Sequence, residues 1–276
     1  ERHAFDSSRY KECKGLFDLD AYEILSLEDS RWFQEKYPEY VLPTRYVDRW
    51  KPTDDGGTIA KSRLVILGFK DPHVLQVERS APTPTNEGFA CTMQVIASNR
   101  WKARSSDIKN AFGQARKSNR TPPICGKQPP GGIPGYDLHP DQLLMARTEV
   151  YGLISGPSWL RQSLVADLED LGYTRNKYDR CILSLPPHLP FGGKPHLSSG
   201  EGVHSALVPK HSDTKRLLNQ GAIMIEVDDI LEAGEPRHDK LMQNFYAKYQ
   251  CGKCKIIMDD PDGTRISGIR VRQDKK

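Results

Sequence analysis

Two adjacent carboxylates, Asp228 and Asp229, lie in the stretch GAIMIEVDDILEAG, between two short apolar runs. Burying a carboxylate among apolar residues costs free energy unless a positive charge or a metal ion compensates for it. Asp is also common in hairpin turns, because its side chain accepts hydrogen bonds from the turn's own backbone. The pair by itself therefore indicates either a metal-binding acid pair or an ordinary turn.

A third acid, Asp107, lies in the segment WKARSSDIKNAF, whose pattern predicts a strand that runs into a helix with Asp107 at the junction. Mg²⁺ prefers oxygen ligands from a few carboxylates and substrate phosphates. Two such ions about 4 Å apart catalyse phosphoryl transfer in many enzymes. Three acids at strand ends or turns therefore suggest metal-dependent phosphoryl transfer, although their spacing does not separate a polymerase from a nuclease or a phosphatase.

Positive charge is concentrated around Asp107. Residues 51–127 hold 13 Lys and Arg against six Asp and Glu, whereas the whole chain has a formal net charge of +4. Such a basic segment is typical of surfaces that bind nucleic-acid or nucleotide phosphates, but a solvated face has the same composition.

Two other compositional features exclude classes of protein. No apolar run approaches the ~20 residues that a membrane-spanning helix needs. The six cysteines are scattered, which fits reduced intracellular thiols better than a disulfide framework. Cys251 and Cys254 have metal-ligand spacing but supply only half of a zinc site, so zinc is not favoured.

Strands and helices alternate along the chain. Residues 1–40 read as an acidic, partly helical lead-in. Short β-branched and aromatic runs at 46–50 and 62–69 predict two strands, and the Asp-Gly signal between them predicts a hairpin turn. Residues 87–98 predict a helix, and the Pro/Gly-rich stretch TPPICGKQPPGGIPGY predicts a loop.

The strongest helix signal follows that loop. Ser158 is the predicted N-cap, Gly172 lies just past the end, and four leucines share one face: Leu160, Leu164, Leu168 and Leu171. Residues 186–220 are polar and without periodicity, and predict a long surface insertion. A strand with Asp228 and Asp229, a helix over 239–250 and a last strand in RISGIRVRQ complete the chain.

Several blocks of the chain, in order, resemble the reverse transcriptase of copia-type LTR retrotransposons. Together they cover roughly residues 41 to 273, and they are KSRLVILGF, SDIKNAF, QPPGG, VYGLISGPSWLRQSLVADLEDLGY, YDRCIL, EVDDIL and ISGIRVRQ. The wording of VLPTRYV and LVILGFKDPHVL also resembles copia-type elements of dinoflagellate genomes.

The resemblance implies an α+β fold with the fingers and palm of a right-hand polymerase, its antiparallel palm sheet flanked by helices. Residues 41–106 would form a fingers-like basic segment after the lead-in. Residues 107–276 would form the palm, with a return to the fingers around 113–150 and the insertion at 186–220. A thumb and an RNase H domain are not expected within this chain.

The resemblance also assigns residues. Asp107, Asp228 and Asp229 would hold two Mg²⁺ ions, which Mn²⁺ can replace. Lys61 and Arg63 would contact the triphosphate of the incoming nucleotide, and Phe112 would block a ribose 2′-hydroxyl. The structural alternatives are a core role for Phe112 and solvated strand charges for the two basic residues.

The implied function is RNA-directed DNA polymerisation, in which a primer 3′-hydroxyl attacks a dNTP. The implied partners are an RNA or DNA template-primer, dNTPs and, in the intact element, integrase and RNase H domains, with no membrane partner. The implied location is intracellular, in a cytoplasmic particle or the nucleus. The alternative is a catalytically inactive remnant, or a domesticated nucleic-acid-binding module, of the same fold.

The chain departs from the family at Glu226, where the family has Tyr before V-D-D, and at 154–158, where the family's K-Q-A-P-R reads ISGPS. Alternation along a strand predicts that Glu226 and Asp228 share a face about 7 Å apart. Glu226 would then crowd the metal site with an additional carboxylate.

Overall fold

The structure is a computed structural model that describes residues 2–53, 56–187, 219–252, 254–266 and 268–274. Contacts divide the chain into two units, each formed by two segments: Glu1–Ala81 with Lys109–Leu164, and Pro82–Ile108 with Val165–Lys276. The boundaries predicted from the sequence lie instead after residues 40 and 106. The difference arises because helix α3 (Asn86–Ser98) packs on strand β10 (Gly221–Glu226) and so belongs with the second unit.

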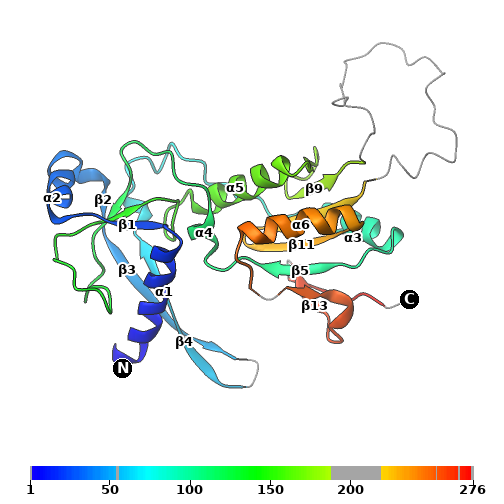
Figure 1. Ribbon diagram of the computed structural model, residues 1–276, viewed down its shortest axis with the longest axis horizontal. Coiled ribbons are helices and arrows are strands. Elements are labelled where there is room, and N and C mark those ends of the chain that lie inside the picture. Colours follow the sequence, from blue (N-terminus) through cyan, green and yellow to red (C-terminus); the bar gives the residue numbers. More distant parts are fainter. Residues whose placement is uncertain (1, 54–55, 188–218, 253, 267, 275–276) are drawn as a thin grey trace, which may run out of the picture. The chain divides into compact units, whose positions relative to one another are not determined.

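The first unit is built on a hairpin and small helices (Figure 1). Its elements are η1 (Arg2–Phe5), α1 (Asp6–Asp18), β1 (Tyr22–Ile24), α2 (Leu27–Lys36), η2 (Pro38–Tyr40), β2 (Val41–Leu42), β3 (Thr44–Pro52), β4 (Thr58–Ile66), η3 (Gly68–Lys70), α4 (Ala111–Gln114), β6 (Cys125–Gly126), β7 (Leu144–Ala146) and the first part of α5 (Gly156–Asp170). Strands β3 and β4 pair antiparallel along their full length, which confirms the predicted hairpin. A four-stranded sheet has the order β1-β7-β6-β2, in which β2 and β6 are parallel.

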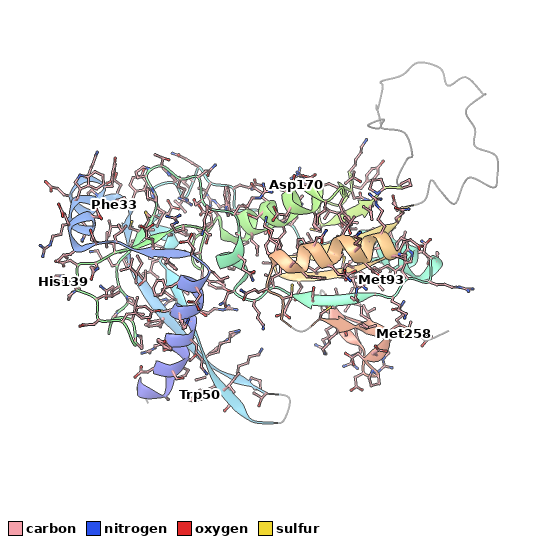
Figure 2. The ribbon with its side chains drawn as sticks, viewed as in Figure 1. Phe33, Trp50, Met93, His139, Asp170 and Met258 are labelled. Atoms are coloured by element: carbon pink, nitrogen blue, oxygen red, sulfur yellow. The ribbon has the colours of Figure 1, made fainter. Side chains whose placement is uncertain are left out.

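Helix α1 packs on one face of this hairpin. Arg9 Nη2 donates to Asp48 Oδ2 at 2.5 Å, and the rings of Phe5 and Trp50 lie 5.0 Å apart. Trp50 stands near the far end of β3 in Figure 2 and remains about half exposed. The opposite face of the hairpin is therefore left for the basic side chains described below.

The second unit is a six-stranded antiparallel sheet with helices packed against it. The strand order is β12-β5-β11-β10-β9-β8. Its elements are α3, β5 (Arg104–Asp107), the end of α5, β8 (Thr174–Arg175), β9 (Ile182–Leu185), β10, β11 (Asp229–Gly234), α6 (Pro236–Lys248), β12 (Lys255–Ile256), η6 (Ile257–Asp259), β13 (Thr264–Ile266) and β14 (Ile269–Val271). Figure 1 shows α6 along β11. The chain thus has a mixed α+β fold, as predicted.

Most predicted elements are present, with corrected boundaries. The helix over 87–98 and the strand-to-helix passage at Asp107 are confirmed. The predicted last strand is a two-stranded hairpin, β13–β14. The predicted insertion at 186–220 lies, except for its ends, outside the described residues.

The predicted N-cap of α5 is wrong. The helix begins at Gly156, so Ser158 lies within its first turn, where its hydroxyl donates to the carbonyl oxygen of Glu78 at 2.9 Å. Three of the four leucines predicted for its face, Leu160, Leu164 and Leu168, are fully buried, whereas Leu171 lies just past the helix end and is partly buried. Gly172 follows the helix with a φ of 97°, the left-handed conformation that favours glycine after a helix end. Within the described residues, no helix combines the length and the apolar character needed to cross a bilayer.

Candidate active site

Asp228 and Asp229 lie at the tip of the β10–β11 hairpin. Glu226 pairs with Asp229, so the turn consists of Val227 and Asp228 alone. Val227 has a φ of 56°. A turn with a positive φ at its first central position normally has Gly there, and a β-branched residue in that conformation costs about 1–3 kcal/mol. Such strain persists where the flanking strands enforce it, and it is concentrated at functional sites.

Strand β5 brings Asp107 to this turn. Asp107 is the direct antiparallel partner of Asp229, and the N–H of the next residue, Ile108, donates to the carbonyl oxygen of Asp228 at 3.0 Å. Opposite residues of an antiparallel pair have Cα atoms about 4.5–5.5 Å apart. The structure therefore brings the three predicted acids together, although Asp107 is far from the other two in sequence.

Glu226 belongs to the same group of acids, but not as the sequence predicts. Asp228 lies in the turn, where strand alternation no longer applies, and Glu226 instead lies directly across from Asp229. Since directly paired residues share a face of the sheet, Glu226, Asp229 and Asp107 form a row across β10, β11 and β5. The predicted pairing of Glu226 with Asp228 is thus replaced by a pairing with Asp229.

Burial and repulsion within this group together raise the pKa of its central member. Partial burial, followed by the charges of Asp228, Asp107 and Glu226, raises the pKa of Asp229 from 3.8 to about 6. Four carboxyl groups lie at this hairpin tip and on the strand paired with it. They offer the oxygen ligands that Mg²⁺ and Mn²⁺ prefer, and a cation relieves their mutual repulsion. The chemistry of these residues therefore fits divalent cations. In the described part of the chain, however, no three Asp, Glu, His or Cys side chains are placed so that they could hold a metal ion together.

Cation binding is expected to weaken as the pH falls through about 6, the pKa of Asp229, because a proton then competes with the cation. The folded-state pKa lies above the ordinary value, so the metal-free protein should gain stability as the pH falls from about 6 toward 4. Calorimetric titration with MnCl₂ should give a constant affinity between pH 7 and 8 and a loss of roughly tenfold per unit below pH 6. Asp229→Asn should abolish this step; an affinity independent of pH from 5 to 8 would contradict it.

A buried ion pair behind the carboxylates fixes the register of their strands. Arg104 of β5 donates to both oxygens of Glu232 of β11, from Nε at 2.6 Å and from Nη2 at 2.9 Å. His238 Nε2 lies 2.7 Å from Glu232 Oε2, and its Nδ1 lies 2.8 Å from the hydroxyl of Tyr173. Burial alone would raise the pKa of Glu232, but the bonds from His238 and Arg104 lower it.

The position of this pair along the strands matters. Arg104 is the direct partner of Glu232, three residues from the pairing of Asp107 with Asp229. A slip of one residue would turn every side chain of a strand to the other face of the sheet. The buried pair therefore specifies that Asp107 and Asp229 meet on the same face.

The other predicted residues lie in the first unit. Lys61 and Arg63 are two residues apart on β4, so their side chains project from the same face of the hairpin. Their paired residues on β3 are Arg49 and Val47, respectively. Partial burial, then the charges of Arg63, Lys51 and Arg49, lower the pKa of Lys61. The clustered side chains make this face of the hairpin positively charged.

Phe112 and Arg63 are linked by a residue that the sequence analysis did not assign, Tyr151. The rings of Phe112 and Tyr151 meet edge to face with centroids 4.7 Å apart, and the guanidinium of Arg63 lies 5.0 Å from the Tyr151 ring. Phe112 is only partly buried, so it is not a residue of the closed core. The structure thus brings Phe112, Tyr151 and Arg63 together within the first unit.

The glycine that follows Tyr151 in VYGL is the sequence feature that could have indicated a close backbone approach at Tyr151. Gly152 has a φ of 96°, and a Cβ there would lie 1.9 Å from the carbonyl oxygen of Ile66. The Tyr151 carbonyl accepts the Ile66 N–H at 2.9 Å. Gly152 thus allows the chain to approach the end of β4 closely enough to hold Tyr151 beside Arg63.

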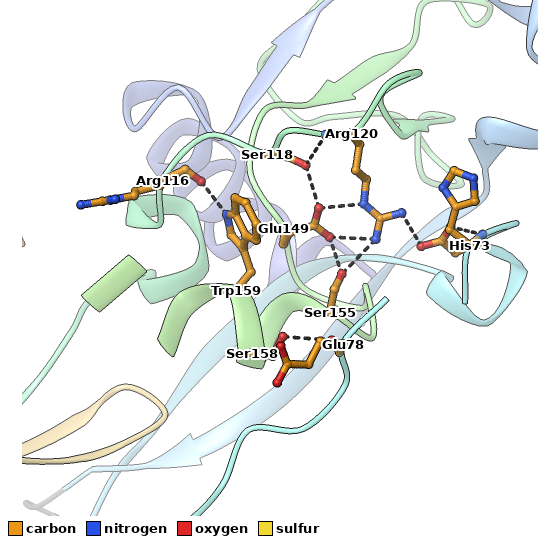
Figure 3. Close-up of polar contacts among 10 residues, drawn as sticks. His73, Glu78, Arg116, Ser118, Arg120, Glu149, Ser155, Ser158 and Trp159 are labelled. Atoms are coloured by element: carbon orange, nitrogen blue, oxygen red, sulfur yellow. Dashed lines mark hydrogen bonds and ion pairs between the residues drawn. The ribbon is translucent and has the colours of Figure 1, made fainter. Parts of the chain in front are cut away.

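A buried polar network fixes the segment that contains Tyr151 (Figure 3). Arg120 donates to both oxygens of Glu149, at 2.7 and 3.0 Å, to Ser155 Oγ at 2.9 Å and to Asp71 at 2.7 Å. Ser118 donates to Glu149 at 2.7 Å, and Ser155 donates to the same carboxylate. Glu149 and Ser155 flank Tyr151 on either side in sequence, so the network closes this loop at both ends. Ser155, one of the departures from the family pattern, thus has a structural role.

No protein-family model matches the chain, and no curated protein matches it significantly.

Proposed function

We propose that the chain is the fingers and palm part of an RNA-directed DNA polymerase of the copia-type retrotransposon class. The row of carboxylates at the β10–β11 turn, with the raised pKa of Asp229, is the observation that supports it most. In this proposal the first unit corresponds to the fingers and the second to the palm. Template-primer and dNTP are the substrates, and the integrase and RNase H of the intact element are the partner domains.

Asp107, Asp228 and Asp229 would hold two divalent cations, Mg²⁺ or Mn²⁺. Cations bound there supply activation of the primer 3′-hydroxyl and neutralisation of phosphate charge. The reaction forms a bond between the primer 3′-oxygen and the α-phosphorus of the dNTP and breaks the bond between that phosphorus and the α–β bridging oxygen. Pyrophosphate is the leaving group, and the hydroxyl proton passes to solvent.

The side chains of the first unit would bind the nucleotide. Lys61 and Arg63 supply positive charge for the triphosphate, since both project from one face of β4. Phe112 supplies an apolar ring against the sugar, and Tyr151 holds that ring from the side at 4.7 Å. In this proposal the Phe112 ring would clash with a ribose 2′-hydroxyl, which favours deoxyribonucleotides.

A second function, nucleic-acid binding without catalysis, is favoured by one observation. Within the described chain no three potential ligand side chains form a ready metal-binding group, whereas the basic face of the hairpin needs no metal to bind phosphates. An inactive remnant or a domesticated binding module would retain that face alone.

Primer extension distinguishes the two functions. The chain is incubated with a DNA primer on an RNA template, the four dNTPs and Mg²⁺ or Mn²⁺, with EDTA as the control. Cation-dependent lengthening of the primer is the expected result. Binding of the same template-primer without extension in either cation would refute the polymerase proposal and support the binding module.

Selection of the sugar provides a prediction for Phe112. Phe112→Val is expected to raise incorporation of ribonucleotides relative to deoxyribonucleotides by about tenfold or more, because it removes the ring that excludes the 2′-hydroxyl. Single-nucleotide incorporation with matched dNTP and rNTP measures the ratio. Tyr151→Phe is the matched control, since it keeps the ring against Phe112 and should leave the ratio near that of the parent. An unchanged ratio in Phe112→Val would return Phe112 to a packing role.

A further inference from the structure

Gly252 lies against Asp107 at the outer edge of β5. Its N–H donates to the carbonyl oxygen of Asp107 at 2.7 Å. A Cβ at position 252 would lie 2.4 Å from Asp107 Oδ1 and 2.5 Å from Oδ2, closer than real Cβ contacts occur. The Asp107 carboxylate therefore occupies the space that any side chain at position 252 would need.

An extra residue in the chain creates this approach. Lys255 pairs with Ser105, and Cys251 forms a bridge to Ile108. Between these two pairings the 251–255 segment advances four residues while β5 and Ile108 advance three, so the 251–255 segment contains a one-residue bulge. Such bulges occur next to active sites, where they re-aim a side chain. The φ of Gly252 is outside the left-handed region, so its lack of a side chain, and not its backbone freedom, is what the contact requires.

Asp107 has different neighbours on its two sides. Asp229 lies opposite it on β11, and Gly252 lies on the other side. Like charges repel, and in the structure the Asp107 carboxylate lies over Gly252. Because the carboxylate lies on the Gly252 side of β5 and Asp229 lies on the other side, a cation shared by the three acids requires Asp107 to turn.

We propose that Gly252 is a positioning residue that holds a resting place for the Asp107 carboxylate, and that a divalent cation turns Asp107 from this place toward Asp228 and Asp229. The inference rests on the proposed function, since it concerns the same carboxylates. The resting place relieves repulsion only in the metal-free protein. Gly252 therefore lowers the affinity for the cation.

Gly252→Ala tests this role, because a methyl group excludes the resting place. The variant is expected to bind Mn²⁺ about two- to fivefold more tightly than the parent at pH 7.5, the range that a partly exposed charge pair supports. Gly15→Ala is the control: it adds a methyl group that would meet only Asn110 Nδ2, at 2.9 Å, and should leave the affinity unchanged. Thermal melting verifies that both variants are folded.

A second measurement uses the unaltered protein. NMR couplings between Hα and Hβ of Asp107 report its χ1 rotamer, which should change when Mg²⁺ is added. Unchanged or weaker Mn²⁺ binding by Gly252→Ala, or one Asp107 rotamer with and without Mg²⁺, would overturn the inference. Absence of cation binding by the parent protein would instead refute the proposed function itself.

Discussion

Asp229→Asn is expected to reduce primer extension by about 10²–10³-fold, the cost of removing one group that stabilises charge in a transition state. Asn keeps the size of the side chain but not its charge, and Asp229 is the central carboxyl group of the row, paired with both Glu226 and Asp107. Extension rates at saturating template-primer and pH 8, where Asp229 is ionised, measure the effect.

Glu226→Gln provides the comparison, because it removes another carboxylate from the same row. It should retain extension and lower the pKa of Asp229, since Glu226 is among the charges that raise it. The same lowered pKa should move the pH dependence of cation binding to lower pH. An Asp229→Asn variant with more than a tenth of the parent rate would show that Asp229 is not part of the catalytic group.

Glu232→Ala is expected to destabilise the second unit by about 3–5 kcal/mol, the usual cost of breaking a buried ion pair by removing one partner. Glu232 is fully buried, and its removal leaves His238 without the carboxylate that it bonds and leaves Arg104 with Asp239 as its remaining carboxylate partner. Denaturant unfolding followed by Trp fluorescence and circular dichroism measures the loss.

Glu169→Ala is the matched control in the same unit. Glu169 accepts two bonds from Arg175, at 2.6 and 2.7 Å, but Arg175 is about half exposed and Glu169 about one-third exposed. Solvent and salt screen such a pair, so its loss should cost at most about 1 kcal/mol. Equal losses in the two variants would mean that the pair of Arg104 and Glu232 does not lock the strand register.

The sequence predicts the carboxylate site better than its surroundings. Asp107 at a strand end and Asp228 with Asp229 between apolar runs are local signals, and the structure pairs Asp107 with Asp229. Glu226 is misplaced because alternation holds along a strand but not through a two-residue turn. The unit boundaries differ because they depend on which distant segments pack together.

Prolines mark the starts of two helices that the sequence prediction placed too late. Pro157 lies in the first turn of α5, and Pro236 begins α6, although the sequence analysis began these helices later. Proline is favoured in the first turn of a helix because it lacks an N–H that would otherwise have no partner there. The serine at 158 was a weaker marker of the helix start than the proline before it.

Long-range contacts were beyond local reasoning. Tyr151 acts on Phe112 and Arg63 only because Gly152 admits its backbone beside Ile66. Gly252 acts on Asp107 only because a bulge brings the two together. Each depends on strand register, which a single sequence does not specify until the fold is known.

Anomalous X-ray diffraction tests the central claim most directly, because Mn²⁺ scatters anomalously and locates itself in the map. Crystals of the chain are grown at pH 8 with a template-primer, a dNTP and MnCl₂, and compared with crystals of Asp229→Asn under the same conditions. The account predicts strong anomalous peaks within coordination distance of Asp107, Asp228 and Asp229 in the parent and their loss in the variant. Peaks elsewhere in the chain, or no peak beside these three carboxylates, would contradict it.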